Sequence, residues 1–295
     1  MIPNRLKPDD AIGLISPSAI ADPAFYADLT ASLQGMGYRV KPANNLYARS
    51  WGYAASDQER ADDIHQLAAD DDVSAILFSG GEGADEVIPL LDYDLIARHP
   101  KIYLSFSDAT SILNAIHTRT GLVTYYGLST SQMVKLTDYN REQFLRHIVQ
   151  GNVREHIRSG PWRTLTPGVA AGELTGGYLD NYVFLAHSGW IQPEPGKEYV
   201  LFIEEHERFF GVEHVSDELG RLEQSPIMKQ ATGLLFGHYS SPVCEPLLER
   251  LTRLGQRHDI PVAYCDDFGH GENSAIFPIG AQAVLDTEKQ TLTYL

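Results

Sequence analysis

Short apolar segments alternate with amphipathic ones through the first 120 residues of the chain. Four segments have the length and composition of buried strands, at residues 11–16, 38–41, 73–78 and 101–106. Apolar residues at helical spacing follow them; one helix begins with a capping box, Ser56 and Glu59, and another helical stretch is broken near Pro89. The alternation predicts an α/β fold with an open parallel sheet and helices on both faces, of the flavodoxin-like type.

The pattern changes near the middle of the chain. Glycine and proline punctuate polar sequence between residues 151 and 168, which is typical of a segment between domains. We therefore predict an N-terminal domain at 1–150, a linker at 151–168 and a smaller C-terminal α/β domain at 169–295. In the second half, strand-like segments lie at 199–204, 232–237 and 261–265, with amphipathic helices between them. Two or three short strands follow at the end of the chain.

Charge narrows the classes of partner. The 295 residues include 23 Lys and Arg against 39 Asp and Glu, a formal net charge of -16. A protein of that sign repels a phosphate backbone, so we expect no nucleic-acid partner. Hydrophobic residues make up 43% of the chain, as in ordinary globular domains, and we expect the whole chain to fold.

The chain also lacks the features of a membrane or secreted protein. No apolar run reaches the roughly 18 residues that a membrane span needs, and the amino terminus lacks the pattern of a secretion signal. Cys244 and Cys265 are the only cysteines, too few for a disulfide scaffold and not spaced as zinc ligands. We expect a cytoplasmic protein with no membrane partner and no cofactor.

Ser107 is the first candidate for chemistry, because it lies where a predicted strand passes into a helix. At that junction a serine side chain lies at the carboxyl edge of the sheet, beside helix amides, which suits a nucleophile. The amide of Asp108, and that of Gly81 in the turn after the neighbouring strand, can form an oxyanion hole. Serine is also a common N-cap, and the string SFSDA lacks the G-x-S-x-G elbow, so the local pattern leaves both interpretations open.

His270 is the candidate base. It lies in the polar segment DDFGHGENS, between two glycines and after a predicted strand. An ordinary surface histidine fits the same pattern, since the chain has 11. A third interpretation is a metal site, although no HExxH or paired CxxC motif accompanies its candidate ligands, Asp266, Asp267, His270 and Glu272.

Glu204 is the candidate orienting carboxylate. It ends the predicted strand YVLFIE, at the carboxyl edge of its sheet, where it can orient a histidine. Glu205 and Glu207 are rivals, and a solvated strand exit also explains the string EEHER. The glycine-rich segment at 80–83 lacks the spacing of a P-loop or a dinucleotide fingerprint, so nucleotide binding there has little support.

Several segments, in this order, resemble the serine peptidase family that contains the murein L,D-carboxypeptidases and the microcin C immunity proteins. The family's nucleophile element typically reads G-Y-S-D-x-T, after a GG-x-G turn and an LDY segment. Here SGGEGA, PLLDYDLI and KIYLSFSDATSIL stand in the same arrangement, and GLVTYYG follows. The likeness continues through LTGGYLDNYVFLA, LFIEEHE and DDFGHGE, so it covers essentially the whole chain.

The resemblance implies roles for these residues: Ser107 as nucleophile, Glu204 as orienting carboxylate, His270 as base, and the amides of Gly81 and Asp108 as oxyanion hole. It also implies two α/β domains with the active site between them, commonly in a homodimer. The implied activity is hydrolysis of an amide bond near a free carboxyl end. The implied substrates are small: a murein tetrapeptide, as in peptidoglycan recycling, or a microcin-like peptidyl or aminoacyl adenylate.

Three residues depart from the family pattern. Ser105 replaces the usual glycine and Phe106 the usual tyrosine, so we expect less backbone strain at the elbow and a missing hydroxyl contact. Tyr178 replaces the asparagine of G-G-N-L, and we expect it near the substrate groove. These departures leave the triad intact but bear on the choice of substrate.

Two other classes of function stay open. One is a metal-dependent hydrolase built on Asp266, His270 and Glu272, which a chelator would inactivate. The other is a non-catalytic two-lobed protein that binds a small molecule, in which Ser107 only caps a helix.

Overall fold

The first half of the chain folds around a parallel sheet. In the computed structural model, which describes residues 1–295, its strands are β1 (Ala11–Ile15), β2 (Arg39–Pro42), β3 (Val73–Phe78), β4 (Ile102–Ser105) and β5 (Thr124–Tyr126). They lie in the order β5-β4-β3-β1-β2, and all neighbours are parallel. This is the flavodoxin-like order, in which the chain changes direction across the sheet between β1 and β3.

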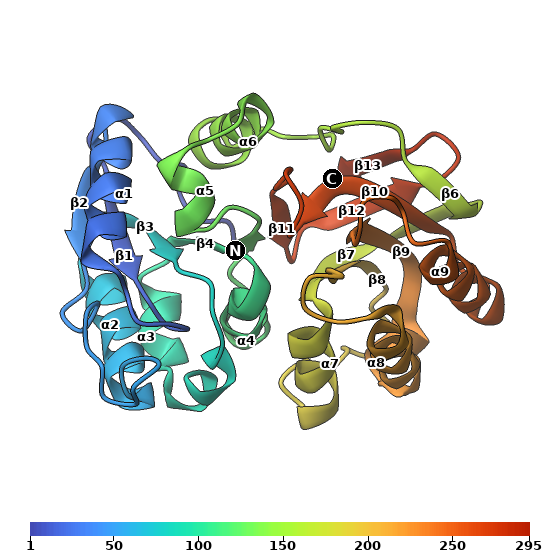
Figure 1. Cartoon of the computed structure of the whole chain (residues 1–295), viewed down its shortest axis with the longest axis horizontal. Helices are drawn as coiled ribbons and strands as arrows, with labels where there is room; N and C mark the ends of the chain where they lie inside the picture. Colours follow the sequence, from blue (N-terminus) through green and yellow to red (C-terminus); the bar gives the residue numbers. More distant parts are fainter. The chain divides into compact units, whose positions relative to one another are not determined.

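Helices cover both faces of this sheet (Figure 1). One face carries α1 (Pro23–Gly35), α5 (Thr130–Val134), α6 (Asp138–Phe144) and the π-helical segment Leu145–Gln150. The other carries α2 (Asp57–Ala69), α3 (Tyr93–Arg98) and α4 (Thr110–Thr120). Short 3-10 turns lie at Ala84–Glu86, Ile88–Leu90 and Ser107–Ala109. The sheet is covered on both sides, so every residue of β1 and β4 is buried.

Local signals in the sequence explain where the helices begin. The capping box of α2 is complete, because the Ser56 hydroxyl accepts from the Glu59 N–H at 3.2 Å and the Glu59 carboxylate accepts from the Ser56 N–H at 2.8 Å. Asp22 caps α1, whose first residue is Pro23.

The second half forms a mixed sheet in the order β13-β12-β7-β8-β9-β10-β6. Its central strands are parallel: β7 (Val169–Tyr178), β8 (Tyr199–Glu204), β9 (Ala231–His238) and β10 (Val262–Gly269). Strands β6 (Arg163–Thr166), β12 (Gln282–Asp286) and β13 (Thr291–Tyr294) add antiparallel edges. The remaining elements are α7 (Leu179–Ser188), α8 (Val212–Gln224), α9 (Glu245–His258), a 3-10 turn at Ile227–Gln230 and β11 (Phe277–Ile279).

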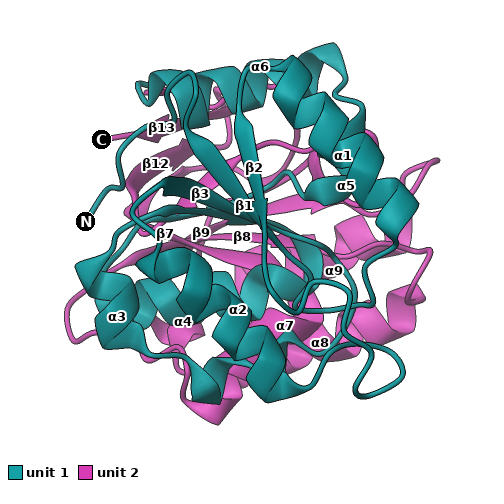
Figure 2. Ribbon diagram, turned by 90° about the vertical axis from the view of Figure 1, so that its left-hand side faces the viewer, with its two compact units in different colours: residues 1–152 teal, residues 153–295 magenta.

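The chain divides into two units, Met1–Asn152 and Val153–Leu295 (Figure 2). Residues 163–166, which we assigned to a linker, form β6 at the edge of the second sheet. Strand β10 is longer than the segment predicted at 261–265, because it continues to Gly269. None of the helices is both long enough and apolar enough to cross a bilayer.

An aromatic cluster fills the core of the second unit below the ends of β8 and β10. Phe202 stacks on Phe277 with ring centroids 4.7 Å apart, and Phe268 meets Phe277 edge-on at 4.6 Å. All three side chains are fully buried. Rigid packing here fixes the two strand ends that carry Glu204 and His270.

Candidate active site

Ser107 lies at the carboxyl edge of the first sheet, two residues after β4. Its backbone is left-handed, with φ of +61°, a conformation that non-glycine residues adopt at a cost and that is typical of strained functional turns. The Ser107 N–H donates to the Tyr126 hydroxyl at 3.1 Å, and the Thr110 hydroxyl donates to the Ser107 carbonyl at 2.6 Å. These bonds hold the turn in a conformation like that of a nucleophile elbow.

The departures at Ser105 and Phe106 are accommodated without loss of the elbow. Ser105 is fully buried, and its hydroxyl donates to the Phe78 carbonyl at 3.2 Å. Phe106 meets the Tyr126 ring edge-on, with centroids 6.3 Å apart. The left-handed φ at Ser107 shows that the strain we expected to be relieved is present with serine at position 105.

The turn after β3 lies against the turn that carries Ser107. Its Ala84 N–H donates to Asp108 Oδ2 at 2.9 Å, and Asp108 is buried. Gly81 in this turn has φ of +146°, and a Cβ atom there would lie 2.1 Å from the Ser18 carbonyl oxygen. Only glycine fits that approach, so the position of the Gly81 amide is fixed by backbone contact.

In the second unit, His270 and Glu204 form a hydrogen-bonded pair. His270 Nδ1 lies 2.9 Å from Glu204 Oε2; the glutamate is fully buried and the imidazole 12% exposed. Gly269 makes this approach possible, because its φ is +106° and a Cβ atom there would lie 3.1 Å from the same carboxylate oxygen. A carboxylate at Nδ1 keeps the proton on that nitrogen, which leaves Nε2 as the basic atom of the neutral ring.

Two aromatic rings flank the imidazole. Tyr178 meets His270 edge-on at 5.3 Å and Phe209 does so at 4.9 Å between ring centroids. Tyr178 ends β7 and is in register with Glu204 on β8, so both belong to the same edge of the sheet. Burial raises the pKa of Tyr178, and the nearby Glu205 carboxylate raises it further, so the phenol stays protonated.

The structure separates Glu204 from its two rivals. Glu205 is buried, and one of its carboxylate oxygens accepts from the His206 N–H at 2.8 Å. Burial raises the pKa of Glu205 to about 8, with the neighbouring Glu204 charge adding to the shift. Glu207 is exposed. Glu204 is therefore the residue of the three whose carboxylate meets the imidazole.

The candidate metal ligands near His270 do not converge. Asp266 pairs with His238 Nδ1 at 2.7 Å, and Glu272 is exposed. Asp267 belongs to the strand and accepts hydrogen bonds in the core from His156 at 3.0 Å and Trp162 at 2.6 Å. These partners make Asp267 a structural residue. Asp266, His270 and Glu272 are not among the side chains whose ligand atoms lie close enough together to hold a metal ion.

Three other side chains could hold a metal ion, because the ligand atoms of Asp180, His214 and Glu218 lie within 4.8 Å of one another. His214 Nε2 is 3.0 Å from an Asp180 oxygen, and Arg221 forms an ion pair with Glu218. Both carboxylates of the group therefore already have a partner within the protein.

Sequence reasoning missed Tyr126 and Phe209. The hydroxyl of Tyr126 meets the Ser107 amide across the sheet from β5, and Phe209 reaches His270 from the loop after β8. Neither has a signal in the local sequence, since each contact depends on how separate segments pack. The structure brings Glu204 and His270 together in the second unit, and the Ser107–Asp108 turn and the Gly81 turn together in the first.

Comparison with known proteins places these features in a family. A model of the LD-carboxypeptidase N-terminal domain matches residues 12–127, and one of the LD-carboxypeptidase C-terminal domain matches residues 171–285. A probable murein peptide carboxypeptidase of Bacillus subtilis (strain 168) is 29% identical over 300 residues, which cover 98% of this chain and 92% of that protein. The microcin C7 self-immunity protein MccF of Escherichia coli is 23% identical over 322 residues, 96% of this chain and 92% of that one.

Solved structures agree. An MccF-like protein from Bacillus anthracis str. Ames matches with a TM-score of 0.90 and 26% identity, covering 100% of this chain and 99% of that one. Two α/β units with this sequence likeness define the class of the protein as a serine peptidase. Within that class, the chain belongs to the LD-carboxypeptidase family, whose two domain models together match most of its length.

Proposed function

We propose that Ser107, His270 and Glu204 act together as a catalytic triad that cleaves an amide bond near a free carboxyl end. The observation that carries the proposal is the buried Glu204–His270 pair, at 2.9 Å, in a chain of this family. The strained turn at Ser107, with φ of +61°, adds support from the first unit.

In the proposed reaction, Ser107 Oγ attacks the scissile carbonyl carbon while His270 Nε2 takes the hydroxyl proton. The amides of Gly81 and Asp108 stabilise the negative charge on the carbonyl oxygen. His270 then gives its proton to the departing amine, which leaves an ester between Ser107 and the acyl half of the substrate. A water molecule, deprotonated by His270, attacks that ester, and the serine hydroxyl is restored.

The substrate class follows from the relatives. One relative is a probable murein peptide carboxypeptidase, and MccF structures include complexes with glutamyl sulfamoyl guanosine and aspartyl sulfamoyl adenosine. We infer a small substrate of one of two kinds, a murein tetrapeptide that loses its terminal residue or a peptidyl or aminoacyl nucleotide. The first kind would give the protein a role in peptidoglycan recycling.

Mass spectrometry of products tests both kinds of substrate with the same enzyme. We expect Ser107→Ala to lose at least about 1,000-fold in kcat on whichever substrate the native protein turns over. The matched control is Ser188→Ala, which removes the hydroxyl of an exposed serine at the end of α7 and should leave turnover unchanged. Undiminished turnover by Ser107→Ala would reject the serine mechanism, and inactivation by a chelator would favour a metal-dependent one.

We also infer that the protein works in the cytoplasm as a homodimer. Both cysteines are free thiols, which suits a reducing compartment, and Cys265 is buried. Light scattering of the purified chain should give twice the mass of 32.7 kDa, and cell fractionation should recover the protein with the cytoplasmic markers. A monomeric mass at all concentrations would overturn the dimer.

A further inference from the structure

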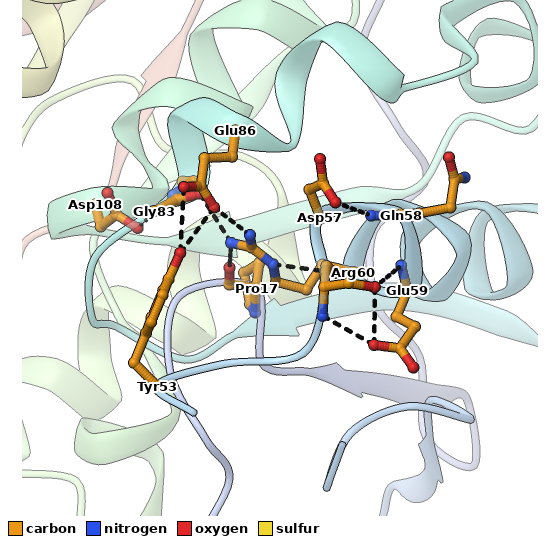
Figure 3. Close-up of polar contacts among 11 residues, drawn as sticks. Pro17, Tyr53, Asp57, Gln58, Glu59, Arg60, Gly83, Glu86 and Asp108 are labelled. Atoms are coloured by element: carbon orange, nitrogen blue, oxygen red, sulfur yellow. Dashed lines mark hydrogen bonds and ion pairs between the residues drawn. The ribbon is translucent and has the colours of Figure 1, made fainter. Parts of the chain in front are cut away.

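An arginine is buried beneath the turn that carries Gly81. Arg60, on α2, has a side chain only 1% exposed. A guanidinium removed from water is costly unless its donors are all met. Here Nη1 donates to the carbonyls of Pro17 and Gly83, both at 2.8 Å, and Nη2 donates to the Glu86 carboxylate at 2.5 Å. Figure 3 shows these hydrogen bonds between the guanidinium of Arg60 and its partners.

The partners of Arg60 come from two different turns. Pro17 lies in the turn after β1, whereas Gly83 and Glu86 follow β3. Strands β1 and β3 are neighbours, and the direction of the chain across the sheet changes between them. Parallel α/β sheets bind their ligands at the carboxyl edge beside such a point. One side chain therefore ties together the two turns that flank it.

Gly81 is held between these tied turns. The Glu82 N–H donates to the Ser18 carbonyl at 2.8 Å, and the space beside Gly81 is filled by the same Ser18 oxygen. The orientation of the Gly81 amide thus depends on how closely the two turns approach. The guanidinium of Arg60 sets the distance between the two turns, because it binds a carbonyl oxygen in each of them.

Tyr53 supports the arrangement from the solvent side. Its hydroxyl donates to Glu86 at 3.0 and 3.2 Å (Figure 3). The Glu86 side chain is 49% exposed. This second contact further restricts the rotation of a half-exposed glutamate. The tyrosine keeps the carboxylate directed at the buried guanidinium.

We propose that Arg60 is a positioning residue for the oxyanion hole. It holds the turn after β3 so that the Gly81 amide points to the place where the oxyanion forms. The inference rests on the proposed function, in which the Gly81 amide is one of the two donors. Lysine cannot replace the arginine, because an ammonium lacks the planar fork that reaches two carbonyls and a carboxylate at once.

Arg60→Lys should lower kcat about 10- to 100-fold, somewhat less than the loss of a whole oxyanion donor, and change KM less than about threefold. The affinity for a peptidyl phosphonate, whose tetrahedral oxygen imitates the oxyanion, should fall by the same factor as kcat/KM. A variant that is merely less well folded would have fewer active sites by titration but an unchanged phosphonate affinity per site. The matched control is Arg39→Lys, the same substitution at a half-exposed arginine paired with Asp72, which should keep full activity.

Glu86→Gln provides a second variant in case Arg60→Lys does not fold. Glu86 is half-exposed, so its loss should leave the fold intact and lower kcat about three- to tenfold through the arginine. Guanidinium added to Arg60→Ala should restore part of its kcat, but not that of Ser107→Ala. If Arg60→Lys folds and keeps the native kcat and phosphonate affinity, the inference is wrong. If Arg60→Lys does not fold, the same result with Glu86→Gln overturns the inference.

Ser107→Ala separates this outcome from failure of the proposed function. If that variant is inactive and the Arg60 and Glu86 variants are fully active, only the positioning role fails. If Ser107→Ala keeps native turnover, the proposed function itself fails.

Discussion

Two adjacent glutamates at the end of β8 have different environments because successive side chains of an extended chain point to opposite sides. Glu204 meets His270, whereas Glu205 is directed toward Tyr178 and the amide of His206. The string EEHE alone therefore left three candidates, and the choice among them depends on the direction of each side chain. The sequence does not show which of these side chains faces His270, because that depends on where the strand begins and ends.

Glu204→Gln keeps the size of the side chain but removes the charge that stabilises the protonated imidazole. We expect kcat to fall roughly 100- to 10,000-fold, as for other orienting carboxylates. Glu205→Gln is the matched control, one residue away and equally buried, and should change kcat by less than about fivefold. Steady-state kinetics on the identified substrate measures both. Equal losses in the two variants would contradict the assignment of Glu204.

Glu205 makes the stability of the protein depend on pH. Its pKa is about 8 in the folded protein against an ordinary value of 4.5, so between these pH values the folded state keeps a proton that the unfolded chain has lost. Its favourable contribution is full below pH 4.5 and is lost as the pH rises through about 8. Glu205→Gln cannot titrate, so it should gain stability relative to the native protein at high pH.

Urea unfolding at pH 5 and pH 8.5 tests this expectation. The free energy of unfolding of Glu205→Gln minus that of the native protein should grow by up to about 4 kcal/mol between the two conditions. Glu207→Gln, at an exposed position two residues on, serves as the control and should show no such growth. The same pH dependence in both variants would mean that Glu205 is ionised in the folded protein.

At the scale of elements, the turn after β3 offers a test with a matched pair of glycines. A Cβ atom at Gly81 would lie 2.1 Å from the Ser18 carbonyl oxygen, whereas one at Gly80 would meet nothing within 4 Å. Gly81→Ala should displace the turn and lower kcat at least about tenfold, because the amide moves away from the oxyanion. Gly80→Ala should be nearly native. Kinetics together with thermal unfolding measures both; native kcat in Gly81→Ala would remove its amide from the proposed oxyanion hole.

The strands that sequence predicted best are the buried central ones. Strands β1, β3, β4 and β8 are covered on both faces, so burial imposes continuous apolar runs that are visible without a structure. The edge strand β6 reads as polar linker because half of its residues are exposed. The long strand β7 is obscured by glycines that it needs: a Cβ atom at Gly176 would lie 1.7 Å from the Phe202 carbonyl oxygen of β8.

The candidate site was also predictable only in part. The elements that carry Ser107, Glu204 and His270 follow from strand ends and from the family resemblance. The contacts that hold these residues in place do not, because Tyr126 and Phe209 reach Ser107 and His270 from segments with no marked local pattern. The same is true of Arg60, which contacts the turn that carries Gly81. Arg60 looks in the sequence like any charged residue on an amphipathic helix, and only its burial distinguishes it.

At the scale of the whole molecule, the proposed triad takes its serine from one unit and its imidazole and carboxylate from the other. Each unit is compact and has its own buried core, so each should fold when made alone. We therefore expect fragments 1–152 and 153–295 to show native-like circular dichroism and cooperative unfolding but no turnover. Both fragments are compared with the full chain on the same substrate.

The result distinguishes mechanisms that a single substitution does not. A metal-dependent site on Asp180, His214 and Glu218 would lie wholly within fragment 153–295 and would give that fragment a chelator-sensitive activity. A triad that needs Ser107 gives fragment 153–295 no activity, whether or not a metal ion is added. Because both fragments are checked for folding before the assay, activity in either one alone would overturn the triad, whereas inactivity of both folded fragments supports a reaction that needs groups from the two units.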